Sequence, residues 1–145
     1  DSDFTRLATR LREAGMKVYG IGEKKTPEPF IVACDKFIYI EILRSKSDES
    51  ETDISKERIA KKNEVEKITP SVIKLISTTI SDLADEDGWA FLGDVGNLLQ
   101  KKQPNFDPRN YGFQKLTPLI NSTNRFEIAE NQKGKLKLIY VRNKK

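Results

Sequence analysis

Histidine is absent from the 145 residues, and its absence excludes several kinds of site. The chain cannot form a Ser/His/Asp triad, a Cys/His dyad, a paired-histidine ribonuclease centre or a zinc site with histidine ligands. Cysteine is scarce as well, because Cys34 is the only one and cannot form an internal disulfide. A single thiol is typical of reducing compartments, so we expect a cytoplasmic protein.

Long hydrophobic runs are also missing. The apolar runs are a few residues long, against the ~20 needed to cross a bilayer, and the chain does not open on a basic and apolar signal segment. Hydrophobic residues make up 37% of the chain and charged residues 33%. This composition predicts a soluble protein without membrane contact, in which small cores accompany a solvated segment.

The net charge of +4 is distributed unevenly. Residues 1–43 and residues 44–67 each carry seven basic and seven acidic side chains, whereas from Val95 onward 11 basic residues oppose three acidic ones. Such a cationic segment favours contact with a polyanion through counterion release. The alternative is a solvated surface with a lysine-rich tail.

Residues 44–68 predict a charged linker, because they lack aromatic side chains and their charges balance. The second half, 55–67, could become helical when docked. The sequence therefore predicts three segments: a first module over 1–43, the linker over 44–68 and a second module over 69–145.

The first module predicts an α/β fragment with a parallel sheet. Phe4, Leu7, Ala8 and Leu11 have helical spacing, with Gly15 as the stop. Residues 16–21 read as a strand, 27–34 as a helix and 36–43 as a second strand. Since about 43 residues are too few to close a covered parallel sheet, we expect the last part of a larger domain.

The second module predicts an α+β winged helix-turn-helix. Apolar stripes indicate one helix from Val72 to Ala84 and another from Trp89 to Leu99, with Trp89 as a core anchor. Asp107 and Pro108 can start a third helix, and residues 125–131 and 135–143 alternate about a turn at Gly134.

The third helix and the hairpin, or wing, carry the candidate nucleic-acid contacts. We predict phosphate contacts and polar base contacts from Arg109, Asn110, Gln114, Lys115, Lys133, Lys135 and Lys137, with Arg142 also on the wing. The alternative is a solvated helix of a winged helix that binds only protein. Tyr111 and Phe113 are interpreted as residues that fix the entry into the third helix.

Asp1 and Asp3 are candidate metal ligands, because Mg²⁺ prefers oxygen ligands and could cleave phosphodiesters without histidine. The alternative is that Asp3 caps the helix that starts near Phe4.

Residues 87–128 resemble the OST-HTH, or LOTUS, domain. Trp89 and Leu92 match the Trp and Leu of that family's second helix. The chain also has its Pro-x-Phe-Asp-Pro turn, starting at Pro104, and its Tyr-Gly-Phe-x-Lys-Leu segment, starting at Tyr111. This resemblance implies a winged helix that binds RNA, including G-rich or structured RNA, or that docks a protein partner such as a helicase. It implies no cofactor for this module.

Residues 1–43 are similar to the C-terminal end of NYN domains, PIN-like proteins regarded as metal-dependent ribonucleases. Asp1 and Asp3 match a late Asp-x-Asp-Phe motif, which implies catalytic and metal-binding roles, and Asp35 matches a further acidic, metal-binding position. The complete domain would use Mg²⁺ or Mn²⁺. The other acidic positions have no counterpart, so we expect no activity from this chain alone unless another chain completes the site.

The sequence therefore predicts an RNA-binding module of a NYN-type RNA-processing protein. The alternative is a protein docking module without direct RNA contact.

Overall fold

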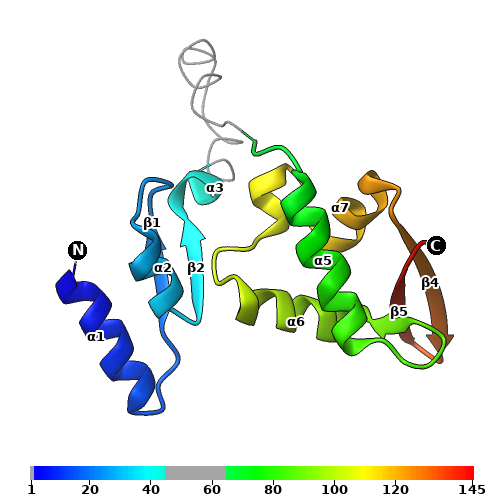
Figure 1. Cartoon of the computed structure of the whole chain (residues 1–145), viewed down its shortest axis with the longest axis horizontal. Helices are drawn as coiled ribbons and strands as arrows, with labels where there is room; N and C mark the ends of the chain where they lie inside the picture. Colours follow the sequence, from blue (N-terminus) through cyan, green and yellow to red (C-terminus); the bar gives the residue numbers. More distant parts are fainter. Residues whose placement is uncertain (1, 45–64) are drawn as a thin grey trace, which may run out of the picture.

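A computed structural model describes residues 2–44 and 65–145, which form two lobes of mixed α/β structure (Figure 1). We call residues 2–44 the N-terminal lobe and residues 65–145 the C-terminal lobe. Asp1 and most of the predicted linker, 45–64, lie outside the described residues. Within the described ranges, no helix combines the length and the apolar character that crossing a membrane requires.

The N-terminal lobe begins with helix α1 (Ser2–Glu13), followed by β1 (Tyr19–Gly22), α2 (Glu28–Ala33) and β2 (Lys36–Tyr39). Gly15 ends α1 with φ +82°, and Met16 N–H donates to the Leu11 carbonyl. The strands β1 and β2 pair in parallel, which confirms the predicted strand direction. Their core consists of Ile31, Cys34, Phe37 and Tyr39.

Two expectations for this lobe were wrong. The predicted strand over 36–43 ends at Tyr39 and continues as helix α3 (Ile40–Arg44), because a short apolar run fits a strand and a buried helical turn equally well. The apolar side chains predicted to form the buried face of α1 are only partly buried: Ala8 is buried, but Phe4 is 65% and Leu7 53% exposed. Helix α1 packs on α2, where the Phe4 and Phe30 ring centroids are 6.5 Å apart.

The C-terminal lobe has the predicted order of helices and hairpin. It contains α5 (Pro70–Leu83), β3 (Trp89–Phe91), α6 (Leu92–Lys102), the 3₁₀ turn η2 (Pro108–Tyr111), α7 (Leu116–Thr123), β4 (Phe126–Lys133) and β5 (Leu136–Asn143). The three strands form an antiparallel sheet in the order β3-β5-β4. The helices close the core with fully buried side chains that include Ile76, Ile80, Val95, Leu99, Leu119 and Ile120.

Three details of this lobe differ from the prediction. Trp89 lies on a strand and is half-buried, while its neighbour Ala90 points into the core. The predicted third helix is split, because Gly112 at φ +84° ends η2 and α7 starts only after Lys115. The lobe also begins before residue 69, since Glu66 N–H donates to the Asn110 carbonyl and Ile68 packs on the core.

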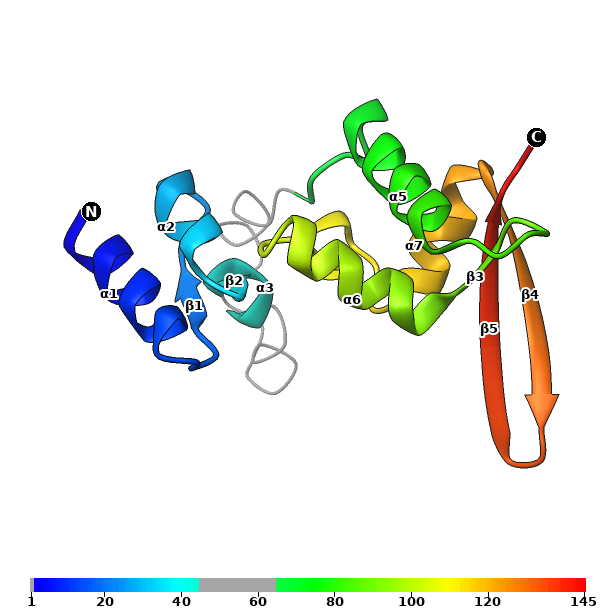
Figure 2. The same cartoon turned by 60° about the horizontal axis from the view of Figure 1, so that its bottom comes forward.

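The β4–β5 hairpin extends beyond the helices and has two different faces (Figure 2). Residues directly opposite in an antiparallel pair share a face. The core face carries Ala90, Val141 and Ile128, and the outer face carries the rows Trp89–Arg142–Glu127 and Phe91–Tyr140–Ala129.

The lobes meet where the free edge of β2 contacts the turn between α6 and η2. Phe37 N–H donates to the Pro104 carbonyl at 2.8 Å, and Asn105 Nδ2 donates to the Tyr39 hydroxyl at 2.8 Å. An edge strand has unpaired backbone groups, so this turn covers part of an edge that would otherwise be open. The contact brings the predicted Pro-x-Phe-Asp-Pro turn against the N-terminal lobe.

Candidate functional site

Arg109, one of the predicted phosphate ligands, is bound within its own turn. The Asp107 side chain caps η2 by accepting from Arg109 N–H, and its two carboxylate oxygens also accept from the Arg109 guanidinium. Burial alone would raise the pKa of the Asp107 carboxyl, but these hydrogen bonds, with the charges of Arg109 and Lys36, hold that pKa below its ordinary value. Arg109 therefore stabilises the turn.

Asn110, predicted as a selective RNA contact, does not reach the surface. It is 4% exposed, and its side-chain Nδ2 donates to the Asn105 carbonyl at 2.9 Å. Tyr111 beside it is 8% exposed and packs on Phe106, with ring centroids 6.1 Å apart. Burial, together with the negative charge of Glu66 and the nearby Tyr39, raises the pKa of Tyr111 to about 12. This burial fits the predicted role of Tyr111 as a packing residue and does not fit a nucleic-acid contact by Asn110.

The start of α7 exposes two of the predicted contact residues. Lys115 occupies the N-cap position in an extended conformation, and Gln114 precedes it. Both side chains are exposed. The positive φ of Gly112 turns the chain between η2 and this segment, and Leu119 and Ile120 anchor α7 in the core. The local sequence therefore presents Gln114 and Lys115 to solvent on a fixed support.

The hairpin separates its predicted lysines. Lys133 is on the outer face of the hairpin, and Lys135 follows Gly134 in the turn. Lys137 is on the same face as the core residues, but it lies near the tip of the hairpin and is exposed. Lys137 Nζ lies 2.9 Å from the Glu130 carboxylate on the same face. Lys133 and Lys135 have no ion pair with any residue in the described ranges.

Ion pairing therefore sorts the basic side chains of the C-terminal lobe into two groups. Lys102 pairs with Asp82, Arg109 with Asp107, Lys137 with Glu130 and Arg142 with Glu127. Within the part of the chain that the structure describes, the exposed side chains without such a partner include the predicted contacts Lys115, Lys133 and Lys135, and also Lys74, Lys101, Arg125, Lys144 and Lys145. The cationic charge is less concentrated on one surface than the sequence suggested, since pairing offsets part of it.

The outer face of the sheet is a surface that sequence reasoning missed. The Arg142 guanidinium lies 4.6 Å from the Trp89 ring centroid, and Phe91 and Tyr140 are in ring contact with centroids 5.8 Å apart. Phe91 is 38% and Leu136 69% exposed. The alternation Trp89-Ala90-Phe91 was the available signal, because it places both aromatic residues on the face opposite Ala90.

The predicted acidic positions do not come together. Asp3 is exposed in the first turn of α1, whereas Asp35 contacts Arg12 in the last turn and accepts a hydrogen bond from Val18 N–H at 2.8 Å. At about 1.5 Å per residue, the nine residues from Asp3 to Arg12 correspond to roughly 13 Å of helix. In the described ranges, no group of three or more acidic or cysteine side chains could hold a metal ion. Asp1 lies outside those ranges, so the residues that can be assessed do not fit a metal centre.

Comparisons with known families assign both parts of the chain. Residues 63–138, more than half of the chain, match the OST-HTH/LOTUS domain, and residues 1–41 match the NYN domain. The chain belongs to the OST-HTH/LOTUS family. The OST-HTH match starts ahead of residue 65, in agreement with the early start of the C-terminal lobe. NYN domains are generally metal-dependent nucleases, and the two domains together indicate an RNA-related protein.

Two solved structures are similar to this OST-HTH chain. A solution NMR structure of a protein from Nitrosomonas europaea shares 34% identity over 66% of this chain and 91% of that chain, with a TM-score of 0.48. Another, from Chromobacterium violaceum, shares 28% identity over 55% of this chain and 86% of that chain, with a TM-score of 0.43. A comparison with curated proteins gave no match.

Proposed function

We propose that the C-terminal lobe is an RNA-binding winged helix within a NYN-type RNA-processing protein. It contacts phosphates through Lys115 at the start of α7 and through Lys133 and Lys135 at the tip of the hairpin, with Gln114 as a polar contact to bases or riboses. The observation that carries this proposal is the sorting of charges. Arg109, Lys137 and Arg142 are offset by carboxylates, while these three, like Arg125 between α7 and β4, are exposed and have no ion pair within the described residues.

The test compares a double charge reversal with a matched control in the full chain. Lys115→Glu with Lys133→Glu should weaken binding to a labelled RNA severalfold and reduce the salt dependence of binding, because about two phosphate contacts are lost. Lys74→Glu with Lys101→Glu makes the same charge change on α5 and α6 and should weaken binding much less. Equal losses in the two double variants would contradict the proposal, provided that circular dichroism shows both to be folded.

A second candidate function is protein docking through the outer face of the sheet. Its support is the exposed apolar side chains of Phe91 and Leu136 beside the half-buried ring of Tyr140, since exposed apolar patches mark interaction surfaces. If this is the function, RNA binding by the full chain should be weak and insensitive to Lys115 and Lys133. A Phe91→Ser, Leu136→Ser variant should then lose a protein partner that the parent chain retains.

For the N-terminal lobe we propose a structural contribution to an NYN fold without metal-dependent cleavage by this chain. The support is the separation of Asp3 from Asp35 and the engagement of Asp35 with Arg12 and Val18. Incubation of the chain with RNA in the presence of Mg²⁺ or Mn²⁺ should leave the RNA intact. Cleavage that a chelator abolishes would show that copies of the chain complete a site together.

A further inference from the structure

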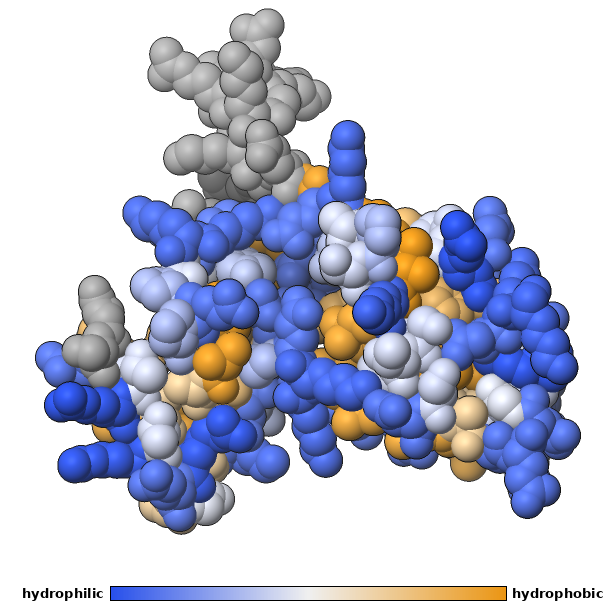
Figure 3. All heavy atoms as spheres, viewed as in Figure 1, coloured by the Kyte–Doolittle hydropathy of each residue, from blue (hydrophilic) through white to orange (hydrophobic). Residues whose placement is uncertain are grey.

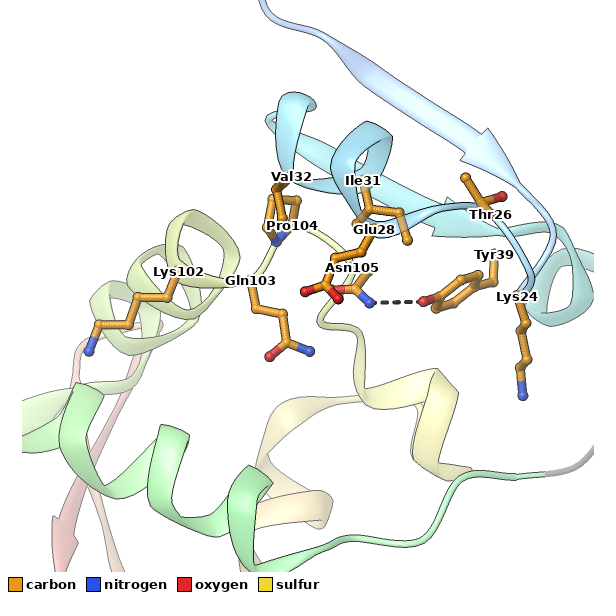
Figure 4. A pocket seen from close by; sticks show the side chains of 10 residues that line it. All are labelled: Lys24, Thr26, Glu28, Ile31, Val32, Tyr39, Lys102, Gln103, Pro104 and Asn105. Carbon is orange, nitrogen blue, oxygen red and sulfur yellow. Dashed lines mark hydrogen bonds between the residues drawn. The ribbon is translucent and has the colours of Figure 1, made fainter. Parts of the chain in front are cut away.

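A cleft of about 410 Å³ lies beside the contact between the lobes (Figure 4). Its walls come from both lobes: Lys24, Thr26, Glu28, Ile31, Val32 and Tyr39 on one side, and Lys102, Gln103, Pro104 and Asn105 on the other. The volume lies within the range of about 300–1,000 Å³ that is usual for ligand sites, and boundaries between domains are preferred places for them. The Asn105–Tyr39 hydrogen bond fixes one wall against the other.

The cleft lies where ligands gather in parallel α/β folds. Lys24 and Thr26 follow the end of β1, and Tyr39 is the last residue of β2. Crevices outside the carboxyl ends of parallel strands are the usual binding sites of such sheets. The second lobe adds its wall through the end of α6 and the turn after it. Neither lobe alone contains the complete site.

The side chains of the cleft differ between its ends and its middle. Figure 4 shows Lys102 and Lys24 at opposite ends, with Gln103, Glu28 and Asn105 between them. Ammonium groups bind phosphate oxygens, whereas amides and carboxylates bind the polar edges of bases. The carboxylate of Glu28 would repel a phosphate in the middle of the cleft, but it can accept a hydrogen bond from the amino group of a base there. Ile31, Val32 and Pro104 supply apolar contacts of the kind that the flat face of a base needs.

We infer that this cleft binds a short stretch of single-stranded RNA, with phosphates at Lys24 and Lys102 and base edges at Gln103, Glu28 and Asn105. Two cations at opposite ends suit two phosphates of one strand better than the single phosphate of a nucleoside monophosphate. The inference rests on the proposed function, because it extends the RNA surface of the C-terminal lobe across to the N-terminal lobe. The face in Figure 3 is largely hydrophilic on both lobes.

The first test uses neighbouring lysines in the full chain as matched pairs. Lys24→Glu should weaken binding of a short unstructured RNA by about threefold or more and lower the salt slope by about 0.7, the value for one phosphate of a single strand. Lys25→Glu, next to it but outside the lining of the cleft, should cause a much smaller change. Equal effects of the two substitutions would overturn the inference.

Lys102 needs a control for its ion pair, because its Nζ lies 2.6 Å from Asp82. Lys102→Gln should weaken RNA binding, but by less than Lys24→Glu does, because Asp82 already offsets part of the charge of the ammonium. Asp82→Asn removes the same ion pair but keeps the ammonium, so it should preserve or tighten binding. If Asp82→Asn weakens binding as much as Lys102→Gln, the effect belongs to folding and the inference fails.

Crosslinking and competition separate the remaining outcomes. RNA that contains 4-thiouridine should crosslink to the segments around residues 24–28 and 103–105, and crosslinks confined to the hairpin would overturn the inference. A nucleoside monophosphate should compete only weakly; competition as strong as that of the strand would show a nucleotide site and overturn the strand assignment. If the chain binds no RNA at all, the proposed function itself fails, whereas RNA binding that ignores the cleft variants rejects this inference alone.

Discussion

Asp107 and Arg109 form a two-pronged contact within one turn, in which Arg109 Nη2 lies 2.7 Å from Asp107 Oδ2 and Arg109 Nε lies 3.0 Å from Asp107 Oδ1. Both side chains are mostly buried, at 23% and 11% exposed. The same carboxylate caps η2 and lies near Lys36 of the N-terminal lobe. One acidic residue therefore holds the turn that contacts β2 and leads to α7.

Asp107→Asn should lower the free energy of unfolding at neutral pH by about 1–3 kcal/mol, because the charged hydrogen bonds to Arg109 are lost. The folded state holds the pKa of Asp107 below its ordinary value. The stabilisation is thus fully present above the unfolded pKa, about 3.9, and is lost as the pH falls through the folded pKa. Urea unfolding at pH 7 and at about pH 3 should show a gap between parent and variant that narrows in acid. A gap of equal size at both pH values would contradict this account.

The hairpin offers a direct comparison of a free and a paired lysine. Lys133→Gln should weaken RNA binding about two- to threefold and lower the salt slope, since it removes an available phosphate contact. Lys137→Gln should have a smaller effect, because Glu130 already offsets that charge at 2.9 Å. Fluorescence anisotropy with a labelled RNA at two salt concentrations measures both. Glu130→Gln supplies the complementary control: it frees Lys137 and should tighten binding.

The sequence predicted the elements of the C-terminal lobe better than their boundaries. The stripe from Val72 onward became α5, with Ile76 and Ile80 fully buried, and the alternation around Gly134 became the β4–β5 hairpin. Such patterns report which face of an element is buried. Hydrophobic patterns do not reveal the positive φ of Gly112, which splits the predicted third helix into η2 and α7. That backbone angle depends on the conformation of the whole turn.

The site residues were harder to predict, because type and spacing do not reveal partners. Arg109 and Lys115 look alike in sequence, yet one is held by Asp107 and the other is exposed. Asn110 follows Arg109 directly and is nevertheless buried. The cleft between the lobes could not be predicted either, since it requires residues 63 to 81 positions apart to face each other, and its polar residues form no recognisable motif.

Two glycines should respond in opposite directions to alanine. A Cβ at Gly20 would lie 2.7 Å from the Phe37 ring and 2.8 Å from Cys34 Sγ, so Gly20→Ala should destabilise the chain by about 1–3 kcal/mol. Gly96 lies inside α6, where the nearest atom to an added Cβ is Leu116 Cδ2 at 3.8 Å. Gly96→Ala should stabilise by about 0.5–1 kcal/mol, because alanine has the higher helix propensity and fewer unfolded conformations. Thermal unfolding followed by circular dichroism measures both, and a stabilising Gly20→Ala would disprove the described packing.

Tyr39→Phe tests whether the two lobes stabilise each other. The substitution removes the hydroxyl that accepts from Asn105 Nδ2 and leaves the backbone hydrogen bond from Phe37 to Pro104 in place. We expect a loss of about 1 kcal/mol and faster hydrogen exchange at the Phe37 amide, since the turn holds β2 less firmly. Tyr19→Phe is the matched control, because Tyr19 is 68% exposed on β1. Equal exchange rates at Phe37 in the two variants would show that the Tyr39 hydroxyl does not help to hold the turn against β2.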